Sequence, residues 1–215
     1  MMISWHGLGC FSIKGKTGQR EVTLVTDPYD NSVGLRFPRT LTASMVLQSH
    51  DAPEANNTDA VHGEEEGKPF LVTHAGEFEV KGAFAAGVRA PKKDGSEHTV
   101  YRIDLEGVSI AFLGALDRDL NDAELTKLGN IDVLILPVGG GPVIDKAVAS
   151  DIVSQIEPRL VIPSYFDVQG LKVKLAGVEA FCKDLSCPRE DANKLKIEKG
   201  SLPTDDIKVA VLTRA

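Results

Sequence analysis

Two almost wholly apolar runs constrain the fold of this chain more than any other feature. They are residues 131–137, Ile-Asp-Val-Leu-Ile-Leu-Pro, and residues 160–163, Leu-Val-Ile-Pro. A continuous apolar run predicts a strand buried on both faces, because a strand with one face in water alternates apolar and polar residues. Between the runs, the apolar residues of 145–156 recur at helical spacing, and Pro158 ends that segment. The sequence therefore predicts central strands that are covered on both faces, with helices on the outside of the fold.

The remaining apolar and turn signals predict many short strands. Residues 3–5 and 10–14 form a predicted hairpin across the glycine-rich turn 6–9, and Asn121 is placed to cap a short helix that stops at Gly129. Further strands are expected at 21–26, 45–47, 70–73, 86–89, 99–104, 108–113 and 207–213, and a further helix at 173–185. Two strand-rich halves with helices in their later parts predict two sheets packed face to face.

Composition and charge narrow the class of protein. The chain has 215 residues, of which 42% are hydrophobic, so residues 1–215 are interpreted as a single domain with a substantial core. The net charge of −7 disfavours nucleic acid as a partner, because a protein that follows a phosphate backbone needs a basic face. No apolar segment approaches the roughly 20 residues of a membrane span, and no signal-peptide pattern opens the sequence. We therefore expect a cytoplasmic protein without a membrane partner.

Cysteine usage agrees with a reducing compartment. The three cysteines, Cys10, Cys182 and Cys187, are too few and too irregularly spaced for a disulfide framework. The four residues between Cys182 and Cys187 do not match the two-residue spacing of a zinc knuckle. All three are expected to be reduced thiols.

Chemistry is expected where the run 45–47 ends and a polar turn begins. His50 follows this predicted strand, and Pro53 marks the irregular segment behind it. A strand end that opens into a loop is a favoured place for ligands. Asp27, in Thr-Asp-Pro at the tip of the preceding predicted strand, has two open interpretations: a site residue, or an Asx-turn that satisfies its own backbone.

The stretch 49–55, Ser-His-Asp-Ala-Pro-Glu-Ala, resembles the metallo-β-lactamase superfamily signature Ser/Thr-His-x-His-x-Asp-His. Four further segments resemble this family in order and spacing: WHGLGCF at 5–11, the glycine-bearing turn HAGEFEVKG at 74–82, FLGALDRDL at 112–120 and IEPRLVIPSYFD at 156–167. The resemblance covers essentially the whole chain. It implies an α/β fold of four layers, the αββα sandwich, and in the family this scaffold carries a zinc-dependent hydrolase site.

The resemblance also implies that most of the metal ligands are replaced. His50 stands at the first histidine of the signature, whereas the bridging aspartate is replaced by Ala115 and the last histidine by Tyr165. The positions of this vestigial site are Asp27, His50, Ala52, Glu54, Ala55, Ala115 and Tyr165. Zinc needs three or four nitrogen, oxygen or sulfur ligands, so no metal and no other cofactor is expected. The alternative is a rebuilt zinc site that draws on His50, Glu54, His74 and Asp27.

Other chemistry has weaker signals. The five histidines never pair at i, i+2 or i, i+4, so each is interpreted first as a hydrogen-bonded or solvent-facing residue. Ser49 lies next to His50, but adjacent strand residues point to opposite faces, which disfavours a nucleophile and base pair. The glycines of 139–141 precede a predicted helix, where they would form a tight turn or cradle an anion, and the tight turn is favoured.

Three functional hypotheses follow. The first is a catalytically silent homologue that binds an unknown protein or small-molecule ligand. The second is an active hydrolase with a rebuilt metal site or a metal-free site. The third is a subunit whose role is assembly, and a homo-oligomer is compatible with all three.

Overall fold

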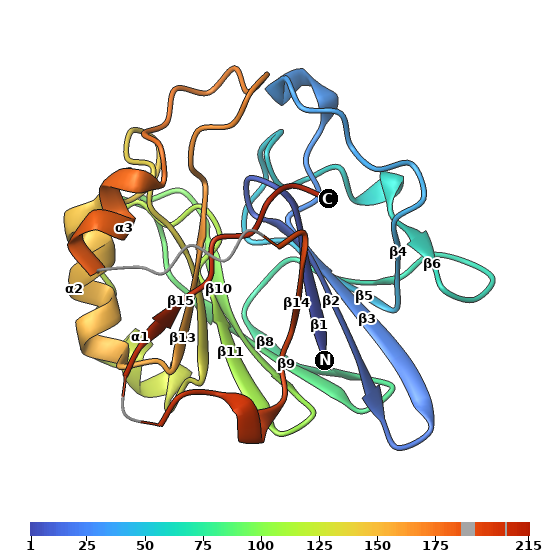
Figure 1. The fold of residues 1–215 in the computed structure, drawn as a ribbon. Coiled ribbons are helices and arrows are strands. Elements are labelled where there is room, and N and C mark those ends of the chain that lie inside the picture. The colour runs from blue at the N-terminus through green and yellow to red at the C-terminus, as the bar shows by residue number, and fades with distance from the viewer. Residues whose placement is uncertain (186–191, 205) are drawn as a thin grey trace.

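The computed structural model describes residues 1–185, 192–204 and 206–215, and within them two β-sheets pack face to face (Figure 1). The first sheet has the order β14 (Lys194–Lys196), β1 (Met2–Gly7), β2 (Cys10–Thr17), β3 (Arg20–Thr26), β5 (Met45–Leu47) and β7 (Phe70–Val72). The second has the order β15 (Lys208–Val209), β13 (Leu160–Ser164), β12 (Val133–Pro137), β11 (Val108–Phe112), β10 (Thr99–Leu105), β9 (Ala83–Arg89) and β8 (Gly76–Val80). A separate short ladder joins β4 (Thr42–Ala43) to β6 (His62–Gly63).

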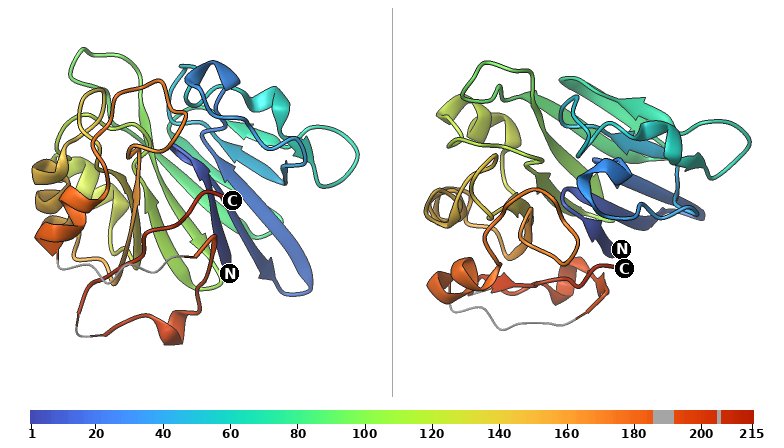
Figure 2. Two further views of the ribbon diagram at one scale, coloured as in Figure 1. Left: turned by 45° about the horizontal axis from the view of Figure 1, so that its top comes forward. Right: turned by 90° about the horizontal axis from the view of Figure 1, so that it is seen from above.

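The helices cover one side of the sandwich. The three α-helices α1 (Asp122–Leu128), α2 (Lys146–Ile156) and α3 (Glu179–Leu185) of the described chain lie on the outer face of the second sheet (Figure 2). The 3-10 turns η1 (Asn31–Val33) and η2 (Thr58–Ala60) belong to the connections on the other side, and η3 (Lys199–Ser201) follows β14. A second apolar cluster, here called the outer cluster, includes Cys10, Val25, Val46, Ala115 and Tyr165 and packs separately from the main core.

The apolar runs behave as their composition predicts. Every residue of β12 and β13 is buried, and the two strands pair in parallel between β11 and β15. Asp145 caps α2 by accepting hydrogen bonds from the amides of Ala147 and Val148, and Asn121 caps α1 in a capping box with Glu124. These predicted elements are confirmed.

Three predicted elements are wrong in extent or kind. The helix expected at 173–185 begins only at Glu179, because the backbone before it bonds to other segments: the amide of Ala176 donates to the carbonyl of Gly139. The strand expected at 207–213 is reduced to β15, and residues 76–80, interpreted as part of a turn, form the edge strand β8. Cys10 and Cys182 are free thiols, as expected, whereas Cys187 lies outside the described residues.

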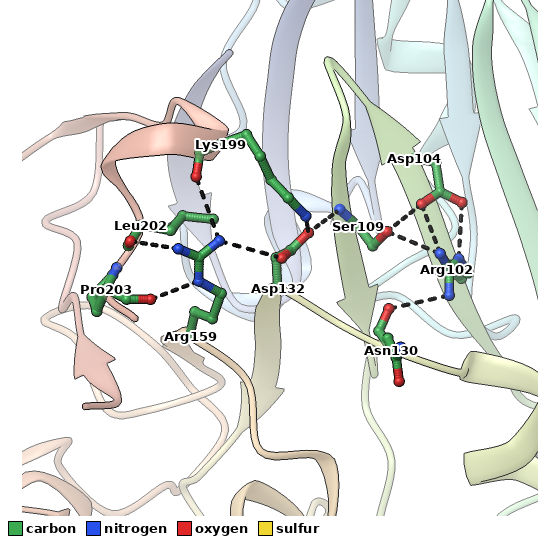
Figure 3. Close-up of polar contacts among 9 residues, drawn as sticks. All are labelled: Arg102, Asp104, Ser109, Asn130, Asp132, Arg159, Lys199, Leu202 and Pro203. Atoms are coloured by element: carbon green, nitrogen blue, oxygen red, sulfur yellow. Dashed lines mark hydrogen bonds and ion pairs between the residues drawn. The ribbon is translucent and has the colours of Figure 1, made fainter. Parts of the chain in front are cut away.

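A polar network holds the ends of the second sheet where β11, β12 and β13 begin (Figure 3). Asp132 accepts a hydrogen bond from the Ser109 amide at 2.9 Å and one from the Lys199 ammonium at 2.5 Å. Arg159 donates to the carbonyls of Leu202 and Pro203, both at 2.6 Å. The network therefore ties the segment around η3 to the sheet.

Among the helices of the described residues, none combines the length and the apolar character of a membrane span.

Candidate functional site

The candidate site lies where parallel strands of both sheets end. Asp27 follows β3, His50 lies three residues after β5, Ala115 follows β11 and Tyr165 follows β13. The strands β3 and β5 run parallel in the first sheet, and β11 to β13 run parallel in the second. Because parallel strands end at the same edge of a sheet, residues far apart in sequence meet there, which is the usual place for a ligand in such folds.

A chain of polar contacts runs from the buried Asp27 to the surface. One carboxylate oxygen of Asp27 accepts from the Ser49 amide at 2.7 Å, and the other accepts from the Ser49 hydroxyl at 2.6 Å. Ser49 Oγ lies 2.9 Å from His50 Nδ1, and His50 Nε2 lies 3.5 Å from Glu54 Oε1. The expectation that Ser49 and His50 point apart is wrong, because β5 ends at Leu47 and strand alternation no longer applies.

Tyr165 closes the site on the other side of Asp27. Its side chain is buried, and its hydroxyl has no hydrogen-bond partner among the described residues. A Cβ atom added to Gly9 would lie 2.8 Å from the Tyr165 ring and 2.9 Å from Asp27 Oδ2, so both groups lie close to this glycine. Ala115 belongs with Tyr165 to the outer cluster. The structure thus surrounds the buried carboxylate with apolar groups on this side.

The other predicted site residues are spread over two hollows on either side of His50. Ala52 and Glu54 line a hollow of about 300 Å³ together with Lys92. His74 lines a larger depression of about 700 Å³, where its ring meets Phe78 edge-on at 5.5 Å. Ala55 is buried and lines neither hollow. Ser49 therefore links Asp27 to His50, and Glu54 lies beyond His50. His74 lines only the larger depression.

His98 is the main residue that sequence reasoning left out of the site. It precedes β10, its side chain is buried, and its ring centroid lies 5.7 Å from that of His50. Neither ring nitrogen has a hydrogen-bond partner in the described chain. Burial, and then the nearby His50 ring, hold the pKa of His98 well below its usual value. A Cβ atom on Gly114 would lie 2.4 Å from Ser49 Oγ and 3.0 Å from His98 Nε2, so that glycine makes room for both.

Comparison with known proteins identifies the family. The sequence model of one protein family, the β-lactamase superfamily domain, matches residues 2–165. This protein belongs to the metallo-β-lactamase superfamily. The fold of a Thermotoga maritima protein classed with the Zn-dependent hydrolases of that superfamily superimposes with a TM-score of 0.80 and 28% identity, over 99% of this chain and 98% of the other. The family and the sandwich expected from the sequence are thereby confirmed.

Two more distant solved structures show the fold alone. A metallo hydrolase from the archaeon Ignicoccus hospitalis matches with a TM-score of 0.63 and 15% identity, over 86% of this chain and 90% of its own. An isothiocyanate hydrolase from Delia radicum gut bacteria matches with a TM-score of 0.64 and 9% identity, over 98% of this chain and 95% of its own. Proteins of this fold thus carry hydrolase names, but a fold does not fix a function, so the residues that could hold a metal in this chain decide the question.

The residues of this superfamily member do not fit a zinc ion. Nowhere in residues 1–185, 192–204 and 206–215 do three histidine, cysteine, aspartate or glutamate side chains gather closely enough to hold a metal. Zinc requires three or four such ligands. Both oxygens of Asp27 are engaged by Ser49, and the methyl group of Ala115 offers no donor.

The buried carboxylate gives the superfamily member a measurable pH response. Burial raises the pKa of Asp27 to about 6, and the His50 ring and the Ser49 hydrogen bonds offset only part of that effect. A carboxyl group with a raised folded-state pKa stabilises the fold fully below its unfolded pKa, and this contribution is lost as the pH rises through the folded pKa. We expect the free energy of unfolding to lose about 3 kcal/mol from this group between about pH 4 and pH 6.

Asp27→Asn should remove that slope while keeping an acceptor for the Ser49 amide. Asparagine also tolerates the left-handed backbone that Asp27 adopts at φ 35°. Urea unfolding at several pH values measures the effect. Asp59→Asn, at an exposed aspartate paired with Lys68, is the matched control and should leave the slope between pH 4 and 6 in place. An unchanged slope in Asp27→Asn would contradict the assignment.

Proposed function

We propose that this protein is a catalytically silent member of the metallo-β-lactamase superfamily that uses the hollows lined by His50 to bind a ligand. The observation that carries the proposal is the buried Tyr165, whose ring lies against Gly9 at the position where the family resemblance places a metal ligand. This buried phenol ring fills space beside Gly9 and near Asp27 that a bound cation and its water would need. With Ala115 beside it in the outer cluster, the site is filled and apolar on this side.

The remaining polar groups support binding better than hydrolysis. In this superfamily hydrolysis depends on a metal that activates water and polarises the substrate, and the donor set for that metal is incomplete here. The Ser49 hydroxyl is buried and donates to Asp27, so it is not poised to attack a substrate. His50 and His98 nevertheless line an open depression. A polar depression without the means of activating water is suited to recognition.

Metal analysis tests the proposal directly. Protein purified without chelator should contain far less than one equivalent of zinc, manganese or iron by plasma mass spectrometry. It should also hydrolyse ester, lactam and phosphodiester substrates no faster than buffer alone does, with and without added zinc. One tightly held equivalent of metal, or turnover that zinc stimulates, would overturn the proposal in favour of a site rebuilt from His50, Glu54, His74 and Asp27.

Restoring the superfamily ligands should create a metal site. The variant combines Ala52→His, Ala55→His, Glu54→Asp, Ala115→Asp and Tyr165→His. Because a metal that binds only the folded state stabilises it, zinc at about 100 times its dissociation constant should raise the free energy of unfolding by about 2.7 kcal/mol. The same variant with Tyr165 retained is the control and should gain much less. Thermal unfolding with and without zinc measures both, and equal gains would show that Tyr165 does not occlude the site.

A further inference from the structure

The hydrogen bonds at Ser49 fix which nitrogen of His50 carries a proton when the ring is neutral. A carboxylate only accepts, so the single hydroxyl proton of Ser49 goes to Asp27 Oδ2, 2.6 Å away. Ser49 Oγ must then accept from the neighbouring nitrogen, His50 Nδ1, at 2.9 Å. The neutral ring therefore presents a lone pair at Nε2.

That lone pair faces another acceptor. His50 Nε2 and Glu54 Oε1 lie 3.5 Å apart, which is longer than the 2.7–3.2 Å of a normal N–H···O bond. Nε2 is buried and has no hydrogen-bond partner in the described chain. A buried polar atom left without a partner costs free energy, so the site as folded is one donor short. Both ring nitrogens of His98 are in the same condition, 5.7 Å away between ring centroids.

The walls of the two hollows are richer in acceptors than in donors. Carboxylates are supplied by Asp51, Glu54, Asp94 and Glu97, whereas the cations that line the hollows are Arg89 and Lys92. Arg89 is already paired with Glu97 through two hydrogen bonds. The surplus of negative charge, in a chain of net charge −7, favours a positively charged ligand over an anion.

We propose that the smaller hollow, which His50 and Glu54 both line, binds a small molecule carrying a primary ammonium group, which donates to His50 Nε2 and Glu54 Oε1 at the same time. An ammonium group has three donors and no fixed coordination geometry, so two or three acceptors suffice, whereas a metal ion needs a converging ligand set. The inference rests on the proposed function, because a zinc ion would coordinate His50 Nε2 and leave no lone pair there for the ligand. Lys92 lies on the wall of the smaller hollow, next to Glu54, and is the internal competitor of the ligand.

Three probes with the same four-carbon chain separate charge from shape. Butylamine, butyramide and butyrate are titrated into the full chain in the presence of chelator, and the ring resonances of His50 and His98 are followed by NMR. Butylamine should shift both rings saturably, and should bind about tenfold more tightly than butyramide, since a charged donor strengthens each hydrogen bond. Butyrate should not saturate.

Variants assign the binding to the bridge between His50 and Glu54. Glu54→Gln should weaken butylamine about tenfold, and Lys92→Gln should tighten it about threefold by removing the competitor. Glu21→Gln is the matched control, since that exposed carboxylate pairs with Lys14 far from the depression, and should leave the affinity unchanged.

Two results would overturn the inference: no saturable shift of the His50 ring with butylamine, or butyrate binding as tightly as butylamine. Either result in a metal-free and inert protein removes only the ligand class and leaves the proposed function standing. One equivalent of zinc in the purified protein removes the proposed function instead, so the two failures are distinguishable.

Discussion

Replacing Gly139 by alanine is expected to lower the free energy of unfolding by about 3 kcal/mol. An ideal Cβ at this position would lie 2.2 Å from the backbone oxygen of Tyr165 and 2.9 Å from Leu175 Cβ. The first neighbour is main chain, which cannot rotate away, so the loop after β12 or the end of β13 must move. Urea unfolding at neutral pH measures the loss.

Gly200→Ala is the matched control for that substitution. Nothing lies within 4 Å of a Cβ built on Gly200, and neither of these two glycines has a backbone that is closed to alanine. Its free energy of unfolding should stay within about 0.5 kcal/mol of the wild type. Equal losses at the two positions would mean that close packing against Tyr165 is not what requires glycine in the 139–141 turn.

Arg159→Ala should cost about 3 kcal/mol through the network shown in Figure 3. The guanidinium donates to the carbonyls of Leu202 and Pro203 and lies 3.8 Å from the Asp132 carboxylate. Removing it leaves two carbonyls without their donor and weakens the attachment of the segment around η3. Arg159→Lys should recover little, because an ammonium cannot present the forked donors that meet both carbonyls.

Arg89→Ala provides the comparison, because it removes an arginine that is also hydrogen-bonded but is exposed. Arg89 and Glu97 side chains are 60% and 75% exposed, and exposed ion pairs contribute about 0–1 kcal/mol. Denaturant titration of both variants should separate them clearly. A loss at Arg159 no larger than that at Arg89 would show that the network does not stabilise the fold.

Much of the architecture could be predicted because strands that are buried on both faces have apolar sequences. The strands β12 and β13 are buried on both faces, so their sequences are apolar throughout and need no pattern to be recognised. The cap Asn121 can also be predicted from the sequence, since its side chain acts on Glu124, three residues further along. These signals are local, so a single sequence contains them without any knowledge of distant partners.

What the sequence did not reveal depends on long-range partners. Residues 173–178 are predicted as part of a helix, but the amide of Ala176 donates to the carbonyl of Gly139, a distant partner that no local pattern records. Ser49 was set aside by strand alternation, although β5 had already ended two residues earlier. His98 immediately precedes β10 and meets His50 only through the packing of the two sheets. Gly114, within the superfamily-like segment 112–120, lies against both Ser49 and His98, a contact that the sequence alone does not show.

The placement of β14 and β15 has a consequence for the order of folding. Both strands come from residues 192–215, and each forms the outer strand of a different sheet, β14 beside β1 and β15 beside β13. Until that segment has been synthesised, β1 and β13 present unpaired edges at the same time, and such edges are the sites where partly folded chains associate. Closure of this flank of the sandwich is therefore a late event that seals both sheets together, and the nascent chain is most prone to aggregation just before it.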